Sequence, residues 1–294
     1  MTTIDAAPDL ASGTESYTEI PTKDIVADND ITYTYRDVGD GDVPLVLLQH
    51  FRGNLDNWDP ALIDALASGR RVVTFNNVGV AGSTGTTPNT VDEMAHGAIE
   101  FLEAMQLRHV DILGFSLGSF VAQEVALIRP GLVGRLVLAS SAPRGASGIH
   151  GWVPDVIDAV GSPQPSPEAV LDVFFGASQV SRAAGMQAFQ RMFARTRGGD
   201  EPISWQTRQA QYDAICTWGI PNAGNLERLT AIPHAVFVAN GDSDRMIPPR
   251  YSYLLAGLLP NAQLKIYPDA AHGFLFQHHA EFATDVSSFL QRTD

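Results

Sequence analysis

The chain has very little cysteine and comparatively few basic residues. Cys216 is its one cysteine in 294 residues, and 33 acidic side chains against 19 Lys and Arg give a net charge of −14. A single cysteine excludes an internal disulfide and a cysteine-rich metal site. Nucleic acids and anionic membranes repel a strongly acidic protein, so we expect neither as a partner. No apolar run is long enough to span a bilayer.

Signals for secretion and for common cofactors are also missing. Residues 1–16 are polar and acidic, without the basic start and apolar segment of a secretory signal, so we expect a flexible N-terminal tail and a cytoplasmic protein. No histidine pair has ligand spacing beside a carboxylate, and Gly-x-Gly-x-x-Gly does not follow the first strand. We therefore expect no metal and no dinucleotide cofactor.

What the chain does contain is an alternation of strand-like and helix-like segments over residues 17–143 and 230–294. This alternation predicts right-handed crossovers and a mostly parallel sheet flanked by helices, that is, an α/β fold. Solidly apolar segments such as 45–48 predict strands covered on both faces. The predicted strands are 31–35, 45–48, 71–75, 109–113, 135–139, 235–239 and 263–267, and the predicted helices are 60–67, 91–107, 119–128, 251–259 and 280–291.

Residues 144–229 interrupt this alternation and predict a helical insertion, or lid. No convincing strand occurs there, and the helix-like segments are 154–160, 167–175, 182–195 and 204–217. The insertion is rich in large apolar side chains. Most must hold its helices together, and a few should line a pocket beneath, which indicates a substrate with an apolar or aromatic portion.

The most informative motif is Gly-Phe-Ser-Leu-Gly at residues 114–118. An apolar, strand-like segment precedes it and a helix-like segment follows it. A Gly-x-Ser-x-Gly between a strand and a helix is typical of a nucleophile elbow, a tight turn that presents one hydroxyl above a sheet. Ser116 is therefore the candidate nucleophile.

A serine nucleophile needs a base and an acid partner, and both are expected at the ends of later strands. Asp242 and Asp244 follow the strand that ends at Ala239, and His272 follows the strand that ends at Tyr267. The order Ser, Asp, His is the one expected when the elbow lies on this type of sheet.

At these residues the sequence resembles the α/β-hydrolase superfamily, over nearly the whole chain from Tyr17. That resemblance implies an eight-stranded, mostly parallel sheet with a helical lid after the sixth strand, and a core formed by residues 17–143 and 230–294 with residues 144–229 as the cap. The family pattern Gly-x-x-Asp-x-x-x-Pro matches Gly241, Asp244 and Pro248, which favours Asp244 over Asp242 as the acid. The late His-Gly of the family is matched by His272-Gly273.

The resemblance also implies an oxyanion hole made of two backbone N–H groups. One should come from Leu117 and the other from the loop after residues 45–48. Counting back from Trp58 places Phe51 at the donor position, and we favour Phe51; aligning His50 on the histidine of the family would choose Arg52 instead. His50 reaches the mouth of the site or packs in the loop. A second departure concerns loop support: Asn76 and Val78 stand where many relatives carry the charged Asp and Arg of Asp-x-Arg-Gly.

The leading functional hypothesis is a serine hydrolase that cleaves a carboxylic ester or lactone through an acyl-enzyme on Ser116. The chain looks most similar to enol-lactonases and to cofactor-free haloperoxidases (perhydrolases), so an enzyme that passes the acyl group to peroxide with the same triad is the alternative. A small-molecule receptor or binding protein that kept the pocket is the alternative without catalysis. The expected partner is a small-molecule ester or lactone with an apolar portion. The sequence leaves open whether the protein forms a homo-oligomer.

Overall fold

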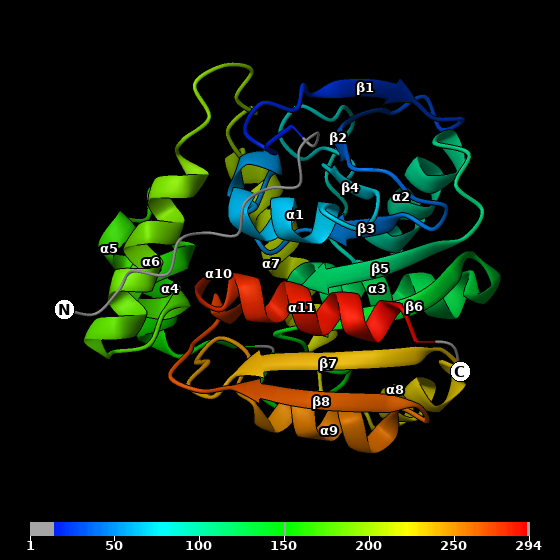
Figure 1. Cartoon of the computed structure of the whole chain (residues 1–294). Helices are drawn as coiled ribbons and strands as arrows, with labels where there is room; N and C mark the ends of the chain where they lie inside the picture. Colours follow the sequence, from blue (N-terminus) through cyan, green and yellow to red (C-terminus); the bar gives the residue numbers. More distant parts are fainter. Residues whose placement is uncertain (1–14, 150, 293–294) are drawn as a thin grey trace.

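One eight-stranded sheet forms the centre of the molecule (Figure 1). The computed structural model describes residues 15–149 and 151–292. The strand order is β1-β2-β4-β3-β5-β6-β7-β8; β1 pairs antiparallel with β2, β2 pairs antiparallel with β4, and the other neighbours are parallel. The strands are β1 (Lys23–Val26), β2 (Thr32–Val38), β3 (Leu45–Leu48), β4 (Val72–Phe75), β5 (Val110–Phe115), β6 (Val133–Ala139), β7 (Ala235–Gly241) and β8 (Ala262–Tyr267).

Helices cover both faces of this sheet, which explains why its central strands are apolar along their whole length. Every residue of β3, β4 and β5 is buried. Helices α1 (Pro60–Ala67) and α11 (His279–Leu290) pack together on the near face in Figure 1, and α2 (Val91–Ala104) packs with α3 (Leu117–Ile128) on the far face. The fold is that of an α/β hydrolase, as the sequence predicts.

A helical insertion lies between β6 and β7, as predicted. It consists of α4 (Pro154–Gly161), α5 (Pro167–Phe174), α6 (Gln179–Met192), α7 (Trp205–Trp218) and α8 (Ala223–Glu227). In Figure 1, helices α4 to α6 stand beside the arrowheads of β5, β7 and β8. The carboxyl ends of the parallel strands therefore face the insertion, which is where such sheets carry their sites.

The differences from the predicted elements are local. Helix α6 begins at Gln179 instead of residue 182, because the Ser178 side chain caps it by accepting from the Ser181 N–H. The eighth strand, to which the sequence assigned no residues, is β1; it is short, largely exposed and at the edge of the sheet. Helix α8 and α10 (Phe274–Gln277) were not predicted, because four or five residues carry no clear helical period. Helix α9 (Arg250–Leu258) matches its prediction within one residue at each end.

The expected N-terminal tail falls mainly outside the described residues, since residues 1–14 are not among them. The structure describes the last two residues of this tail, 15 and 16. The hydroxyl of Ser16 donates a hydrogen bond to Asp64 Oδ2 at 2.8 Å. None of the helices in the described part of the chain is long and apolar enough to cross a membrane.

Candidate active site

Ser116 occupies a strained turn between β5 and α3. Its φ of 54° and ψ of −120° lie outside the regions that L-residues favour. Only 3% of the surface of Ser116 is exposed to solvent. The two motif glycines make the turn possible. A Cβ at Gly114 would lie 2.4 Å from the Gly118 carbonyl oxygen, and one at Gly118 would lie 2.0 Å from the Leu48 carbonyl oxygen. The sequence motif thus folds into the elbow that it predicts.

The structure brings Ser116, His272 and Asp244 together, although they are far apart in the sequence. Ser116 Oγ lies 2.9 Å from His272 Nε2, and His272 Nδ1 lies 2.8 Å from Asp244 Oδ2. All three residues are buried. A carboxylate can only accept, so Nδ1 carries the imidazole proton and leaves Nε2 to accept from the serine hydroxyl. This arrangement can move a proton from Ser116 to His272.

The second candidate acid, Asp242, lies elsewhere. Its carboxylate accepts from the backbone N–H groups of Asp269 and Ala270, so it supports the loop that carries His272. Asp244 is held by the N–H groups of Met246 and Ile247, which donate to Oδ1 at 2.8 and 2.9 Å. One oxygen of Asp244, Oδ1, therefore binds the turn, and the other, Oδ2, binds His272.

The candidate donors for an oxyanion hole are the N–H of Leu117, directly after Ser116, and an N–H of the loop after β3. Leu117 is the first residue of α3, so its N–H has no acceptor within the helix, and the helix dipole favours negative charge at that end. Across the described residues, the N–H of Phe51 makes no hydrogen bond. Arg52 differs, because its N–H donates to Gln211 Oε1 at 2.8 Å. Only Phe51, of the two candidates, keeps a free donor.

Arg52 instead connects the loop after β3 to the insertion. Its guanidinium donates to the carbonyl oxygens of Val160 at 3.0 Å, Ser162 at 2.6 Å and Pro163 at 3.2 Å, at the end of α4. The backbone of Arg52 has a φ of 63°. The role of Gln211 in this connection carries no signal in the sequence, because 159 residues separate it from Arg52.

A cavity of about 460 Å³ opens over Ser116 and His272. Its walls come from the loop after β3 and from the insertion, with Phe174 as the aromatic side chain that the insertion contributes. The volume suits a small molecule, and the lining is largely apolar. The apolar lining residues are Phe51, Val160, Pro163, Pro165, Val170, Phe174, Pro202, Ile203 and Met246.

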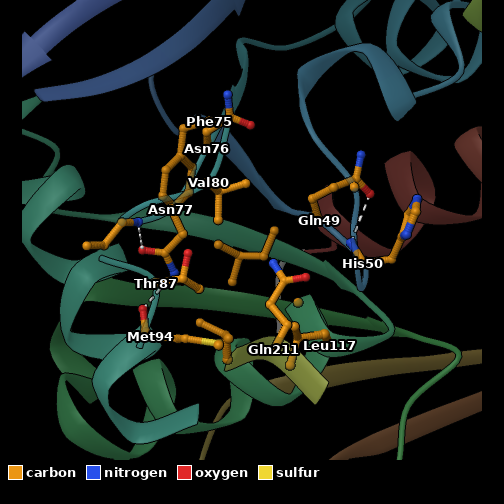
Figure 2. Close-up of a pocket in the computed structure, with 15 residues that line it drawn as sticks. Gln49, His50, Phe75, Asn76, Asn77, Val80, Thr87, Met94, Leu117 and Gln211 are labelled. Atoms are coloured by element: carbon orange, nitrogen blue, oxygen red, sulfur yellow. Dashed lines mark hydrogen bonds between the residues drawn. The ribbon is translucent and has the colours of Figure 1, made fainter. Parts of the chain in front are cut away.

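A smaller chamber, of about 40 Å³, lies behind the loop after β3 (Figure 2). Gln49 Oε1 accepts from the His50 N–H at 2.9 Å, and the Gln211 amide points toward the centre of the chamber. The His50 ring points away from the other labelled side chains and also lines the larger cavity. His50 therefore separates the two spaces.

Asn76 supports the neighbouring loop, in keeping with the sequence interpretation. Its amide donates to Thr34 Oγ1 at 2.8 Å and to Asp200 Oδ2 at 2.7 Å, which ties β4 to the insertion. Asp200 also accepts from the Leu55 N–H. Over residues 15–149 and 151–292, no group of three or more His, Cys, Asp or Glu side chains is placed to hold a metal ion.

Known proteins resemble this chain over most of its length. It is 28% identical over 245 residues to a 2-hydroxymuconate semialdehyde hydrolase of Pseudomonas sp. (strain CF600), with 81% of this chain and 82% of the relative covered. It is 27% identical over 278 residues to a non-heme chloroperoxidase of Streptomyces lividans, with 87% and 95% covered.

Solved structures share the fold. An alpha/beta hydrolase fold protein from Chitinophaga pinensis superposes with a TM-score of 0.89 at 38% identity, covering 95% of this chain and 100% of that one. The enol-lactonase from Burkholderia xenovorans LB400 superposes with a TM-score of 0.72 at 20% identity, covering 92% and 100%, and supports the fold alone. The resemblance to haloperoxidases inferred from the sequence is confirmed, and the enol-lactonase shares the fold. The profile of the alpha/beta hydrolase fold matches residues 43–279, and the chain belongs to the α/β-hydrolase family.

Proposed function

We propose that this protein is a serine hydrolase that cleaves a carboxylic ester or lactone through an acyl-enzyme on Ser116. The observation that carries the proposal is the hydrogen-bonded series from Ser116 Oγ through His272 to Asp244, at 2.9 and 2.8 Å, at the base of a largely apolar cavity. Ser116 is the nucleophile, His272 the base and Asp244 the acid that orients the imidazole.

Acylation begins when Ser116 Oγ attacks the substrate carbonyl carbon while its proton passes to His272 Nε2. The carbonyl oxygen becomes negative, and the N–H groups of Leu117 and Phe51 stabilise it. The carbonyl then re-forms, the bond to the alcohol oxygen breaks, and His272 returns the proton to that oxygen. From an ester, this half-reaction gives the free alcohol and the acyl-serine; from a lactone, the new hydroxyl stays attached to the acyl group of the acyl-serine.

Water completes the reaction by the same path. A water molecule attacks the carbonyl carbon of the acyl-serine through its oxygen while His272 Nε2 takes one of its protons. His272 then passes that proton to Ser116 Oγ as the ester bond breaks. The carboxylic acid leaves and the serine is restored. The largely apolar wall of the cavity favours an apolar portion in the substrate.

Turnover of p-nitrophenyl acetate and butyrate tests this proposal. Ser116→Ala should reduce turnover by at least about 10⁴-fold while the protein stays folded by circular dichroism. Wild-type protein should also be labelled at Ser116 by a fluorophosphonate probe. Full turnover by Ser116→Ala would contradict the mechanism. A folded wild-type protein that resists the probe and turns over no ester would instead indicate a binding protein.

A second candidate is a perhydrolase, since non-heme chloroperoxidases are among the relatives. In that case hydrogen peroxide takes the place of water, attacks the acyl-serine and leaves as a peracid. Bromination of monochlorodimedone in acetate buffer with peroxide and bromide separates the two. Bromination that is abolished by Ser116→Ala and exceeds hydrolysis of simple esters would favour the perhydrolase.

A further inference from the structure

His50 is a second imidazole in the site, and the proposed reaction does not use it. It lines the 460 Å³ cavity together with Ser116 and His272. Its ring lies 5.2 Å from that of Phe115 and 5.4 Å from that of Phe174. The His272 ring lies 5.1 and 5.3 Å from the same two rings. The two imidazoles therefore share one aromatic enclosure.

The hydrogen bonds of His50 leave one of its nitrogens as an acceptor. Nδ1 lies 2.8 Å from the Phe51 carbonyl oxygen, which can only accept, so Nδ1 carries the proton. Nε2 then has its lone pair free, and within the described residues it has no hydrogen-bond partner. Burial, with the nearby His272 as a smaller cause, lowers the pKa of His50 to about 4. The ring is thus neutral at pH 7 and able to accept.

The other polar side chains that line the cavity are largely engaged. The Arg52 guanidinium donates to three carbonyl groups of the insertion. Asn54 donates to the Glu201 carbonyl and accepts from the Asp56 N–H, and Asn57 Oδ1 accepts from the Asn54 N–H. Outside the reacting groups, His50 Nε2 is therefore the side-chain acceptor left unmatched in a largely apolar space. His50 is half-buried and lines the cavity, so an acceptor without a partner from the protein favours a ligand that brings a donor into this apolar space.

We propose that His50 is a specificity-determining residue whose Nε2 accepts a hydrogen bond from a hydroxyl group of the substrate. The substrate class is accordingly a hydroxylated ester or lactone, with the hydroxyl on the acyl or the alcohol part. This proposal rests on the proposed hydrolase function. A site built around such a hydrogen bond discriminates against the analogue that lacks the hydroxyl, because that analogue leaves Nε2 unpaired.

Pairs of esters that differ in one hydroxyl test the proposal. The acyl pairs are ethyl 2- and 3-hydroxybutyrate against ethyl butyrate, and the alcohol pair is 2-hydroxyethyl butyrate against propyl butyrate. Acid release is followed by pH-stat. We expect wild type to prefer the hydroxylated member of at least one pair by about 10-fold in kcat/KM. A ratio near one in every pair would overturn the proposal.

Two variants assign the preference to Nε2. His50→Asn keeps a donor where Nδ1 stands but lacks Nε2, and His50→Phe keeps the ring against Phe115 and Phe174 but lacks both nitrogens. The ratio within a pair should fall toward one in both, whatever the absolute rates. A ratio that survives in both variants would assign the preference to another group and overturn the proposal.

A binding measurement covers the case in which the variants lose turnover. Titration calorimetry in the Ser116→Ala background should give tighter binding of the hydroxylated ester, and the difference should disappear in Ser116→Ala/His50→Asn. If the difference persists in the double variant, the proposal is wrong. Failure of the hydrolase function itself looks different, because wild type would then turn over neither member of any pair.

Discussion

The two halves of the site are held in different ways. The Ser116, His272 and Asp244 side is fixed by turns of the sheet core, in which short backbone contacts such as those at Gly118 and the N–H groups of Met246 and Ile247 set each position. The Phe51 side is fixed from outside, because Arg52 and Gln211 bind its loop to the insertion. The position of the core half therefore follows from local sequence. The position of the Phe51 half depends on how the insertion packs against the loop after β3.

The largest expected effect is on the core half and separates the two aspartates. Asp244→Asn should lower kcat by about 10⁴-fold, because an amide no longer holds the imidazole in the correct tautomer. Asp242→Asn is the matched control, since its carboxylate only supports a loop, and it should keep activity within about 10-fold of wild type. Ester turnover of both variants checks this prediction, and equal losses would contradict the assignment of the acid.

We also expect that adding a single methyl group at the elbow lowers the free energy of unfolding more than adding one at an open glycine position. Gly118→Ala would put a Cβ 2.0 Å from the Leu48 carbonyl oxygen, and we expect an unfolding free energy lower by about 3 kcal/mol. Gly131→Ala is the control, because nothing lies within 4 Å of the added Cβ. Urea unfolding measures both. A tolerated Gly118→Ala would show that the strand and helix can separate there.

On the Phe51 half, the depressed pKa of His50 gives a pH-dependent contribution to stability. Because the folded pKa is about 4 against 6.5 for the free side chain, the unfolded chain binds the proton more readily. The contribution is present above pH 6.5 and is lost as pH falls toward 4, by about 2 kcal/mol between pH 7 and 5. His50→Phe should remove this part of the acid sensitivity, measured by urea unfolding at the two pH values. An unchanged pH dependence would mean that His50 titrates normally.

The smallest expected effect concerns the connection between the insertion and the loop that carries Phe51. Arg52→Met removes the hydrogen bonds to Val160, Ser162 and Pro163 and should lower kcat/KM about 10-fold, because the Phe51 N–H is then less well positioned. Arg182→Met, which breaks an exposed ion pair with Asp172 inside the insertion, should change it less than 3-fold. Similar effects of both variants would argue against a connection between insertion and oxyanion loop.

Much of the core could be predicted because its signals are local. The elbow at residues 114–118 has a fixed spacing, and Asp244 and His272 follow parallel strands whose carboxyl ends meet at one edge of the sheet. Local patterning favoured Phe51 without excluding Arg52, because both lie in one loop. A contact from Gln211, on a helix far along the chain, separates them by occupying the Arg52 N–H.

By itself, the sequence determined the order of strands and helices, the position of the insertion and the three side chains of the relay, since these depend on residue period and motif spacing. The tertiary structure alone decided which N–H groups stay free and that a neutral His50 faces the cavity. Those outcomes depend on contacts between segments that packing brings together, and no local pattern records them.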